Sequence, residues 1–219
     1  MISIAIPVGP HPSNTRWLNE CLASIAEQTM PADDVLLIDD GAGLDMDSLP
    51  PLPGLRIWRT PWRSGVAHGF NFGVALAKHD LVIMLGSDDR LMPDAVAECW
   101  RTWQQIHDPH GYYYLPVLYH DGRVQHVPCN AAMVHKGLWE LTGGFPIEGA
   151  VGACDALLMN KMQVANGRLG TLYPVGVEEH PLYWYRAHDE TDTNVRRKWH
   201  GVVAVIRNML IDEVISGGG

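Results

Sequence analysis

Short apolar segments alternate with helical patterns throughout the first 110 residues of this chain. The apolar segments are predicted strands, at residues 2–6, 35–38, 55–58 and 81–85. The two clearest helical patterns are residues 65–78 and 93–106, the second of which starts with a proline. Nearly continuous apolar strands that alternate with helices are typical of a parallel sheet covered on both faces. The sequence therefore predicts an α/β fold.

A further helix is expected close to the N-terminus, after a loop that begins at Pro7. Ser13 or Asn14 is suitably placed to cap this helix. Its apolar stripe has members spaced three or four residues apart, namely Trp17, Leu18, Cys21, Leu22 and Ile25.

The pattern changes after residue 110, where extended segments mix with helices. Residues 112–119 and 124–127 are predicted strands on either side of His120-Asp121-Gly122-Arg123, and Asp-Gly favours a tight hairpin turn. Residues 155–166 and 198–215 are predicted helices, and residues 171–177 are predicted to be extended.

Composition excludes several classes of protein. With 47% apolar and 19% charged residues, the chain can bury a real core and is not intrinsically disordered. The formal net charge is −9, and the only basic cluster is residues 196–198, which argues against binding nucleic acid through its phosphates. The four cysteines have neither zinc-site nor redox spacing, and no apolar run is long enough to span a membrane. We expect a cytoplasmic protein with no transmembrane segment.

Polar groups follow three of the predicted strands. They are Pro7-Val8-Gly9, Asp39-Asp40-Gly41 and Gly86-Ser87-Asp88-Asp89. Ligands of open parallel sheets bind beyond the carboxyl ends of the strands, near the point where strand order reverses. Adjacent carboxylates repel each other unless a cation or hydrogen-bond donors compensate, so Asp88-Asp89 suggests Mg²⁺ or Mn²⁺. The alternatives are that Asp88 or Asp89 caps the helix that starts near Pro93, and that Asp39-Asp40-Gly41 is a turn.

Two nucleotide-binding motifs are missing. The chain has no GxGxxG after its first strand and no GxxxxGK[ST], so it lacks the phosphate cradle of a dinucleotide oxidoreductase or a P-loop NTPase. A site without that cradle needs a metal ion to hold a diphosphate.

Taken in order, these segments resemble the family 2 glycosyltransferases, which have the GT-A nucleotide-sugar fold. The resemblance is carried by Ile4-Ala-Ile-Pro7, residues 18–29, Leu36-Leu-Ile-Asp39-Asp40-Gly41, residues 65–73, residues 81–89 with Leu91-Met-Pro93-Asp94, Thr142-Gly-Gly-Phe145, Cys154-Asp155 and Tyr185-Arg186-Ala-His188. It implies one GT-A domain over residues 1–219, with a mostly parallel central sheet. Residues 1–110 would form the nucleotide-sugar half, and residues 111–219 an acceptor half with antiparallel strands and a C-terminal helix.

The resemblance also implies roles for individual residues. A Mn²⁺ or Mg²⁺ ion would be held by Asp89 and His188, and Asp155 would be the general base of an inverting single displacement onto an acceptor hydroxyl. The donor would be a UDP-sugar, although dTDP presents the same base edge. Its binding residues would be Pro7, Val8, Asp39, Asp40, Gly65, Asn71, Ser87, Asp88 and Arg196.

The sequence departs from the family pattern at three positions. Gly86 replaces the usual first aspartate of the metal motif, Cys154 replaces a glutamate, and Phe70 replaces an arginine that often precedes Asn71. These departures leave a noncatalytic nucleotide-sugar-binding module as an alternative. A nucleotidyltransferase is disfavoured, because residues 7–14 contain no Lys or Arg.

The acceptor is not specified by the sequence. A saccharide, a lipid-linked glycan and a protein are all compatible with it, and a modified DNA base ranks last because of the charge. Aromatic residues that could stack on a sugar are Tyr112, Tyr113, Tyr114, Trp139, Trp184 and Tyr185.

Overall fold

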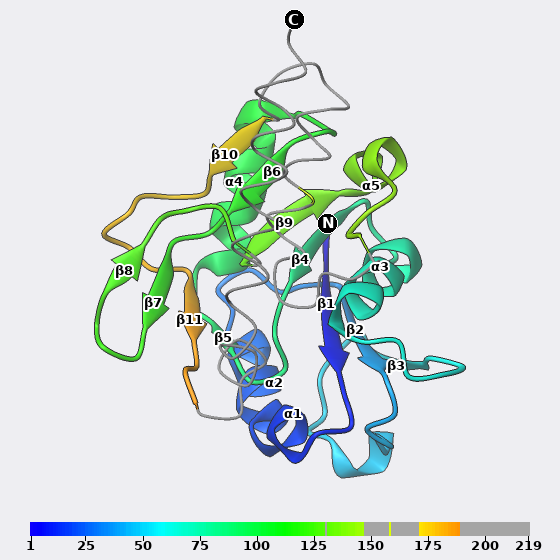
Figure 1. The fold of residues 1–219 in the computed structure, drawn as a ribbon. Coiled ribbons are helices and arrows are strands. Elements are labelled where there is room, and N and C mark those ends of the chain that lie inside the picture. Colours follow the sequence, from blue (N-terminus) through cyan, green and yellow to red (C-terminus); the bar gives the residue numbers. More distant parts are fainter. Residues whose placement is uncertain (130, 147–157, 159–170, 189–219) are drawn as a thin grey trace, which may run out of the picture.

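The structure is a computed structural model that describes residues 1–129, 131–146, 158 and 171–188. Seven strands form one sheet in the order β10-β6-β9-β4-β1-β2-β3 (Figure 1). Their bounds are β1 Ile2–Val8, β2 Asp34–Asp39, β3 Leu55–Arg59, β4 Leu81–Met84, β6 Tyr112–Tyr114, β9 Ala132–His135 and β10 Leu172–Pro174. The neighbours β3, β2, β1 and β4 are all parallel, whereas β9 is antiparallel to β4 and β6. The predicted α/β fold and its four N-terminal strands are confirmed.

Strand order reverses between β1 and β4. The chain adds β2 and then β3 on one side of β1, and it crosses to the other side to add β4. The carboxyl ends of β1 and β4 therefore flank the crevice where such sheets bind their ligands.

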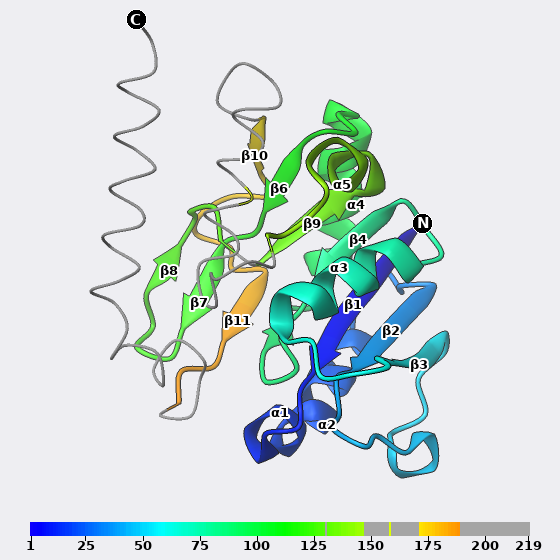
Figure 2. The same cartoon turned by 45° about the vertical axis from the view of Figure 1, so that its right-hand side comes forward.

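Helices cover both faces of this sheet (Figures 1 and 2). They are α2 Leu18–Ala26 and α4 Ala95–Ile106 on one face, and α3 Val66–Leu76 and α5 Lys136–Thr142 on the other. The side chains of β1 alternate between the faces: Ile4 and Ile6 lie in the cluster with α2 and α4, and Ala5 lies in the cluster with α3.

Two glycines let α3 lie close to β1. A Cβ atom at Gly73 would be 2.6 Å from Ala5 Cβ, and one at Gly69 would be 2.7 Å from Pro7 Cβ. The strand itself continues through Pro7 to Val8, although the sequence predicted a loop from Pro7. Pairing with β4 ends at Ala5, so a proline at position 7 interrupts no pairing on that side.

The predicted strand at residues 112–119 is two strands. Pro116 separates β6, which belongs to the large sheet, from β7 Val117–Tyr119, which belongs to a second sheet. That sheet has the order β5-β11-β7-β8, with β5 Arg90–Leu91, β8 Val124–Gln125 and β11 Tyr183–Tyr185. The predicted hairpin is confirmed, because β7 and β8 pair antiparallel and Gly122 has a φ of 81° in the turn.

The first helix begins earlier than the sequence predicted. It is α1 Pro12–Arg16, and its cap is His11, whose side chain accepts a hydrogen bond from the Ser13 N–H. Ser13 and Asn14 lie inside this helix, because a proline without an N–H suits the first helical position. Trp17 separates α1 from α2 and does not continue an apolar stripe.

Some expectations fall outside the described residues, namely the helices at 155–166 and 198–215 and the side chains of Cys154, Asp155 and Arg196. Among the cysteines that are described, Cys21 and Cys99 are buried and Cys129 is partly buried. Within the same part of the chain, every helix is too short or too polar to cross a membrane.

Candidate active site

The carboxyl ends of the parallel strands bring the predicted polar segments together. The Asp40 N–H donates to the carbonyl of Val8 at 2.9 Å, which joins the end of β1 to the end of β2. On the other side of β1, the Leu85 N–H donates to the Ala5 carbonyl at 3.1 Å, just before Gly86-Ser87-Asp88-Asp89. The three polar segments thus line one edge of the sheet, as the sequence predicted.

Asp39 organises the turn that follows β2. Its Oδ1 accepts the N–H groups of Ala42 and Gly43 at 2.7 and 3.1 Å, and its Oδ2 accepts the N–H of Leu44 at 2.9 Å. This is the turn role that Asp-Asp-Gly favours when it is considered alone.

Asp40 holds the loop that leads from β3 to α3. Its Oδ1 accepts from Thr60 Oγ1 at 2.9 Å and from both the N–H and the hydroxyl of Ser64 at 2.7 Å. Its Oδ2 accepts the N–H of Gly65, the residue that precedes α3, at 2.7 Å. Burial alone would raise the pKa of Asp40, but the hydrogen bonds from Ser64, Gly65 and Thr60 outweigh it and lower the pKa below its ordinary value.

Asp89 is a buried carboxyl group, 5% exposed, that is engaged by protein donors on both oxygens. The Tyr183 hydroxyl donates to Oδ2 at 2.6 Å, and the Arg186 N–H donates to Oδ1 at 2.8 Å. Burial and the charge of Asp88 raise the pKa of Asp89 to about 8, against the lowering effect of those two hydrogen bonds. The antiparallel pairing of β11 with β5 is what places Tyr183 and Arg186 beside Asp89.

Asp88 is the carboxylate that meets His188. The distance from His188 Nε2 to Asp88 Oδ2 is 2.9 Å, across 100 positions of sequence. This is the distance of a direct hydrogen bond between the two side chains. It is also close to the separation of about 3 Å between cis ligands of an octahedral cation with bonds of about 2.1 Å, such as Mg²⁺ or Mn²⁺. The sequence predicts Asp89 and His188 as metal ligands; the structure places His188 beside Asp88, and Asp89 accepts hydrogen bonds from Tyr183 of β11 and from the Arg186 N–H that follows it. Neither aspartate caps α4, whose N-cap residue is Asp94.

Gly86 leaves room for the two carboxylates. A Cβ atom at this position would lie 2.6 Å from Asp89 Oδ2 and 3.1 Å from Asp88 Oδ1. The Gly86 N–H also donates to the Tyr183 hydroxyl at 3.0 Å. The family's aspartate at this position would therefore require Asp89 to move away from Tyr183.

The other predicted donor-binding residues have different surroundings. Asn71 belongs to α3, and its side chain contacts α5 and the segment that follows it: its Oδ1 accepts from Trp139 Nε1 at 3.0 Å and from the Phe145 N–H at 2.8 Å. The amide nitrogen of Asn71 donates to the Phe145 carbonyl at 3.0 Å. Asn71 thus supports the Thr142-Gly-Gly-Phe145 segment. Ser87 is buried beside Asp88.

Two residues of the site were missed by sequence reasoning or given another role. Tyr183 was not singled out, although it is two residues before Tyr185 and so shares its face of a strand. Trp17 was assigned to an apolar stripe, but its ring lies 4.6 Å from the ring of His188. Among the candidate sugar-stacking residues, Tyr112 and Tyr113 are fully buried.

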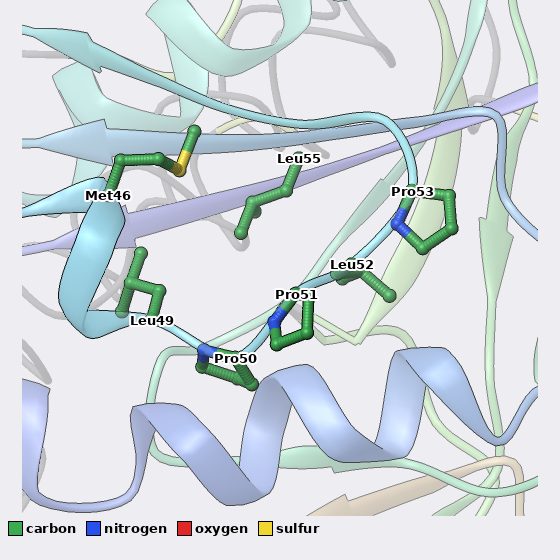
Figure 3. A pocket seen from close by; sticks show the side chains of 7 residues that line it. All are labelled: Met46, Leu49, Pro50, Pro51, Leu52, Pro53 and Leu55. Atoms are coloured by element: carbon green, nitrogen blue, oxygen red, sulfur yellow. The ribbon is translucent and has the colours of Figure 1, made fainter.

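One pocket lies apart from this edge. It has a volume of about 650 Å³ and is formed by the connection between β2 and β3 (Figure 3). Its lining residues are Met46, Leu49, Pro50, Pro51, Leu52, Pro53 and Leu55. None of the predicted site residues that the structure describes lines it.

Comparisons with known proteins agree with this geometry. The family model for glycosyl transferase family 2 matches residues 13–138, more than half of the 219 residues. The O-antigen biosynthesis protein RfbC of Myxococcus xanthus is 31% identical over 104 residues, which cover 45% of this chain and 8% of RfbC. The glycosyltransferase GlyG of Streptococcus pneumoniae is 22% identical over 187 residues, which cover 77% of this chain and 61% of GlyG.

Solved structures give the same result. S. aureus TarS residues 1–349 in complex with UDP-GlcNAc has a TM-score of 0.69 at 14% identity, over 88% of this chain and 60% of that chain. The complex of the same TarS fragment with UDP has a TM-score of 0.67 at 15% identity, over 86% of this chain and 61% of that chain. This likeness confirms the expected GT-A fold.

The chain spans less than two thirds of the length of each of these relatives. The match to the family model nevertheless includes the ends of β2 and β4, together with Asp40, Asp88 and Asp89. The chain belongs to glycosyltransferase family 2.

Proposed function

We propose that this chain is an inverting glycosyltransferase that moves a sugar from a UDP-sugar to an acceptor hydroxyl with the help of a divalent cation. The observation that carries the proposal is the 2.9 Å approach of His188 Nε2 to Asp88 Oδ2 at the carboxyl end of β4. The two residues are 100 positions apart in the sequence and meet beside the reversal of strand order, where ligands of such sheets bind.

In this proposal Asp88 and His188 hold Mn²⁺ or Mg²⁺, and Asp89 keeps Asp88 in place. Neither oxygen of Asp89 needs to leave its protein donor for this arrangement to work. When bound, the cation supplies positive charge that offsets the charge on the departing diphosphate. Arg196 is proposed as a further contact for that diphosphate.

Asp40, Pro7 and Val8 are proposed to contact the nucleoside at the ends of β2 and β1. Within the part of the chain that the structure describes, Oδ2 of Asp40 accepts one hydrogen bond, from the Gly65 N–H, and a carboxylate oxygen has two acceptor sites. It can therefore also accept the imide hydrogen of uracil. The TarS complexes with UDP and UDP-GlcNAc are consistent with a UDP carrier, and the sugar itself stays open.

Asp155 is proposed as the general base. It would take the proton of the acceptor hydroxyl while that oxygen attacks the anomeric carbon from the face opposite the diphosphate, so that the configuration inverts. A positioned base contributes about 10²- to 10⁴-fold to the rate.

A noncatalytic nucleotide-sugar-binding module is the second candidate. It is favoured by Gly86, which stands where the family has an aspartate and where a side chain would collide with Asp89. Such a module would bind UDP with a cation but would release none from a UDP-sugar.

One experiment tests both candidates. A panel of UDP- and dTDP-sugars is screened with Mn²⁺, Mg²⁺ or EDTA for protection against thermal unfolding. A ligand at a hundredfold excess over its Kd adds about 2.7 kcal/mol to the free energy of unfolding. Hydrolysis of the protecting donor is then measured. Protection with hydrolysis supports the transferase, protection without hydrolysis supports the binding module, and absence of cation-dependent protection contradicts both.

A further inference from the structure

Arg186 donates hydrogen bonds to the loop that carries Asp88. Its Nε donates to the Asp88 carbonyl at 2.8 Å, and its backbone N–H donates to Asp89 Oδ1 at 2.8 Å. It also lies two residues before His188 on the segment that follows β11. One residue thus fixes the loop that carries Asp88 to the segment that carries His188.

The guanidinium of Arg186 is held between two aromatic rings. Its Cζ atom lies 4.6 Å from the ring centroid of Trp17 and 4.6 Å from that of Trp184. Its third hydrogen bond, to Glu20 Oε2 at 2.6 Å, fixes the rotation of the guanidinium plane between these rings. We call Arg186, Trp17, Trp184 and Glu20 the arginine clasp.

The clasp reaches His188 directly. The ring centroid of Trp17 lies 4.6 Å from Arg186 Cζ and 4.6 Å from the ring centroid of His188, and Arg16 Cζ lies 5.0 Å from it. Trp17 lies at the junction of α1 and α2, so its contact with His188 joins the segment after β11 to the N-terminal part of the chain. The orientation of the His188 ring therefore depends on the position of the Trp17 ring. Arg186 contacts that same ring and so helps to fix its position.

We propose that Arg186 is a positioning residue: clamped between Trp17 and Trp184, it sets the His188 ring and the Asp88 loop at the spacing that one cation requires. The inference rests on the proposed function, because the cation belongs to that function. The inference adds to the proposed function a residue that assembles the cation site. That residue, Arg186, is not itself a ligand of the cation.

The clasp acts through geometry more than through charge. The pair of Arg186 with Glu20 involves a carboxylate that is 51% exposed, and exposed ion pairs contribute about 0–1 kcal/mol. A planar guanidinium, in contrast, stacks on two rings and donates in fixed directions, which an ammonium group does not reproduce. Arg186→Lys is therefore expected to behave like Arg186→Gln, and Glu20→Gln like the wild type.

The first test needs no metal. A histidine proton that lies over an indole ring shifts upfield in the NMR spectrum, and the His188 resonance is identified by its loss in His188→Gln. In the metal-free protein we expect this upfield shift in the wild type and in Glu20→Gln, and its loss in Arg186→Gln and Arg186→Lys. An unchanged His188 resonance in Arg186→Gln overturns the inference, whatever the protein does with nucleotides.

The second test uses Mn²⁺ together with UDP. Electron spin echo measurements detect the nitrogen of a histidine bound to Mn²⁺, and titration gives the Kd of the metal. Loss of a residue that orients a metal ligand typically weakens metal binding about 10- to 100-fold. In Arg186→Gln we expect this weakening of Mn²⁺ binding together with loss of the nitrogen signal. In Glu20→Gln we expect a Kd for Mn²⁺ within about twofold of that of the wild type.

Arg123→Gln is the matched control. Arg123 also pairs with a carboxylate, Asp121, at 2.6 Å and also lies over a ring, that of Tyr119, at 5.6 Å, but in the turn between β7 and β8. It should change neither readout. Trp184→Leu serves if Arg186→Gln fails to fold, because it removes one ring and keeps every hydrogen bond of Arg186; it should also lose the nitrogen signal.

The outcomes separate the two proposals. A wild-type protein that binds no Mn²⁺ with UDP contradicts the proposed function, and the metal-free NMR test still decides whether Arg186 seats His188. A wild-type protein that shows the nitrogen signal, with Arg186→Gln and Trp184→Leu that retain it at unchanged Kd, overturns the inference alone. An effect of Glu20→Gln equal to that of Arg186→Gln also overturns it, because charge pairing and not orientation would then be responsible.

Discussion

The Tyr183 hydroxyl donates a 2.6 Å hydrogen bond to Asp89 Oδ2 and accepts the Gly86 N–H at 3.0 Å. Tyr183 and Asp89 are 94 positions apart in the sequence, and both are nearly inaccessible to solvent. This one hydroxyl ties the strand before His188 to the loop that carries Asp88. The stability of the fold and the geometry of the site therefore depend on the same contact.

Tyr183→Phe removes that hydroxyl and leaves a buried carboxyl oxygen and a buried N–H without their partner. We expect the free energy of unfolding to fall by about 1–3 kcal/mol, the cost of unsatisfied buried polar groups. Urea unfolding measures it. Tyr114→Phe, in β6 of the large sheet, is the control and should lower the free energy of unfolding by less. Equal stability of Tyr183→Phe and the wild type would contradict the structural role of the Tyr183 hydroxyl.

Gly86→Asp restores the aspartate that relatives carry at this position. Because its Cβ would lie 2.6 Å from Asp89 Oδ2, the substitution is expected to lower the midpoint of thermal unfolding in metal-free buffer. It should also weaken cation-dependent UDP binding, because Asp88 would move with Asp89. A variant that is both more stable and a tighter UDP binder would show that the glycine is not required by packing.

Gly73→Ala tests the close approach of α3 to β1. Alanine is the better helix former by about 1 kcal/mol, but its methyl group would be 2.6 Å from Ala5 Cβ. Overpacking of this kind costs about 1–3 kcal/mol, so we expect net destabilisation in urea unfolding. The double variant Ala5→Gly/Gly73→Ala recreates the space, and it should be more stable than the sum of its two single variants predicts.

We expect the free energy of unfolding to depend on pH through Asp34. Burial alone would raise its pKa, but hydrogen bonds from Arg56, the Lys78 N–H and Ser3 lower it from 3.8 to about 2. A pKa depressed in the folded state gives stability that is complete above the unfolded pKa and is lost as pH falls from about 4 through 2.

The expected loss is about 2 kcal/mol over that interval, since one pKa unit corresponds to about 1.4 kcal/mol. Urea unfolding of the wild type and Asp34→Asn at about pH 6 and pH 2.5 measures it. The variant should be less stable at the higher pH and should lack this part of the acid dependence. Parallel pH profiles for the two proteins would show that Asp34 does not carry the effect.

Asp155→Asn tests the proposed general base. The amide cannot accept the acceptor proton, so kcat should fall by about 10²- to 10⁴-fold while the Kd of the UDP-sugar stays close to that of the wild type. Single-turnover transfer and donor titration measure the two quantities. Unchanged turnover would remove Asp155 from the mechanism.

Local pattern was sufficient to predict the N-terminal half. Runs such as 35–38 and 81–85 are apolar on both faces, which only strands buried between two layers of helices require. The position of Asp39, Asp40, Asp88 and Asp89 after such strands was enough to place them at one edge of the sheet. The start of α1 was missed because Pro12 and His11 form a cap that differs from the usual Ser or Asn.

The sequence could not assign separate roles to neighbouring carboxylates. Asp88 and Asp89 are the same residue type at adjacent positions, yet Asp88 contacts His188 and Asp89 accepts a hydrogen bond from Tyr183. Asn71 likewise matched a donor-binding pattern, but it lies between Trp139 and Phe145. Each of these roles is set by a partner about 70 to 100 positions away.

The sequence by itself determined the alternation of strands and helices and the family, because side-chain periodicity and the order of motifs are properties of the chain read locally. Only the tertiary structure decided which aspartate faces His188 and which residues hold that pair. The physical reason is that β5 and β11 pair across more than 90 positions, and the direction of each carboxylate follows from the donors that this pairing brings to it.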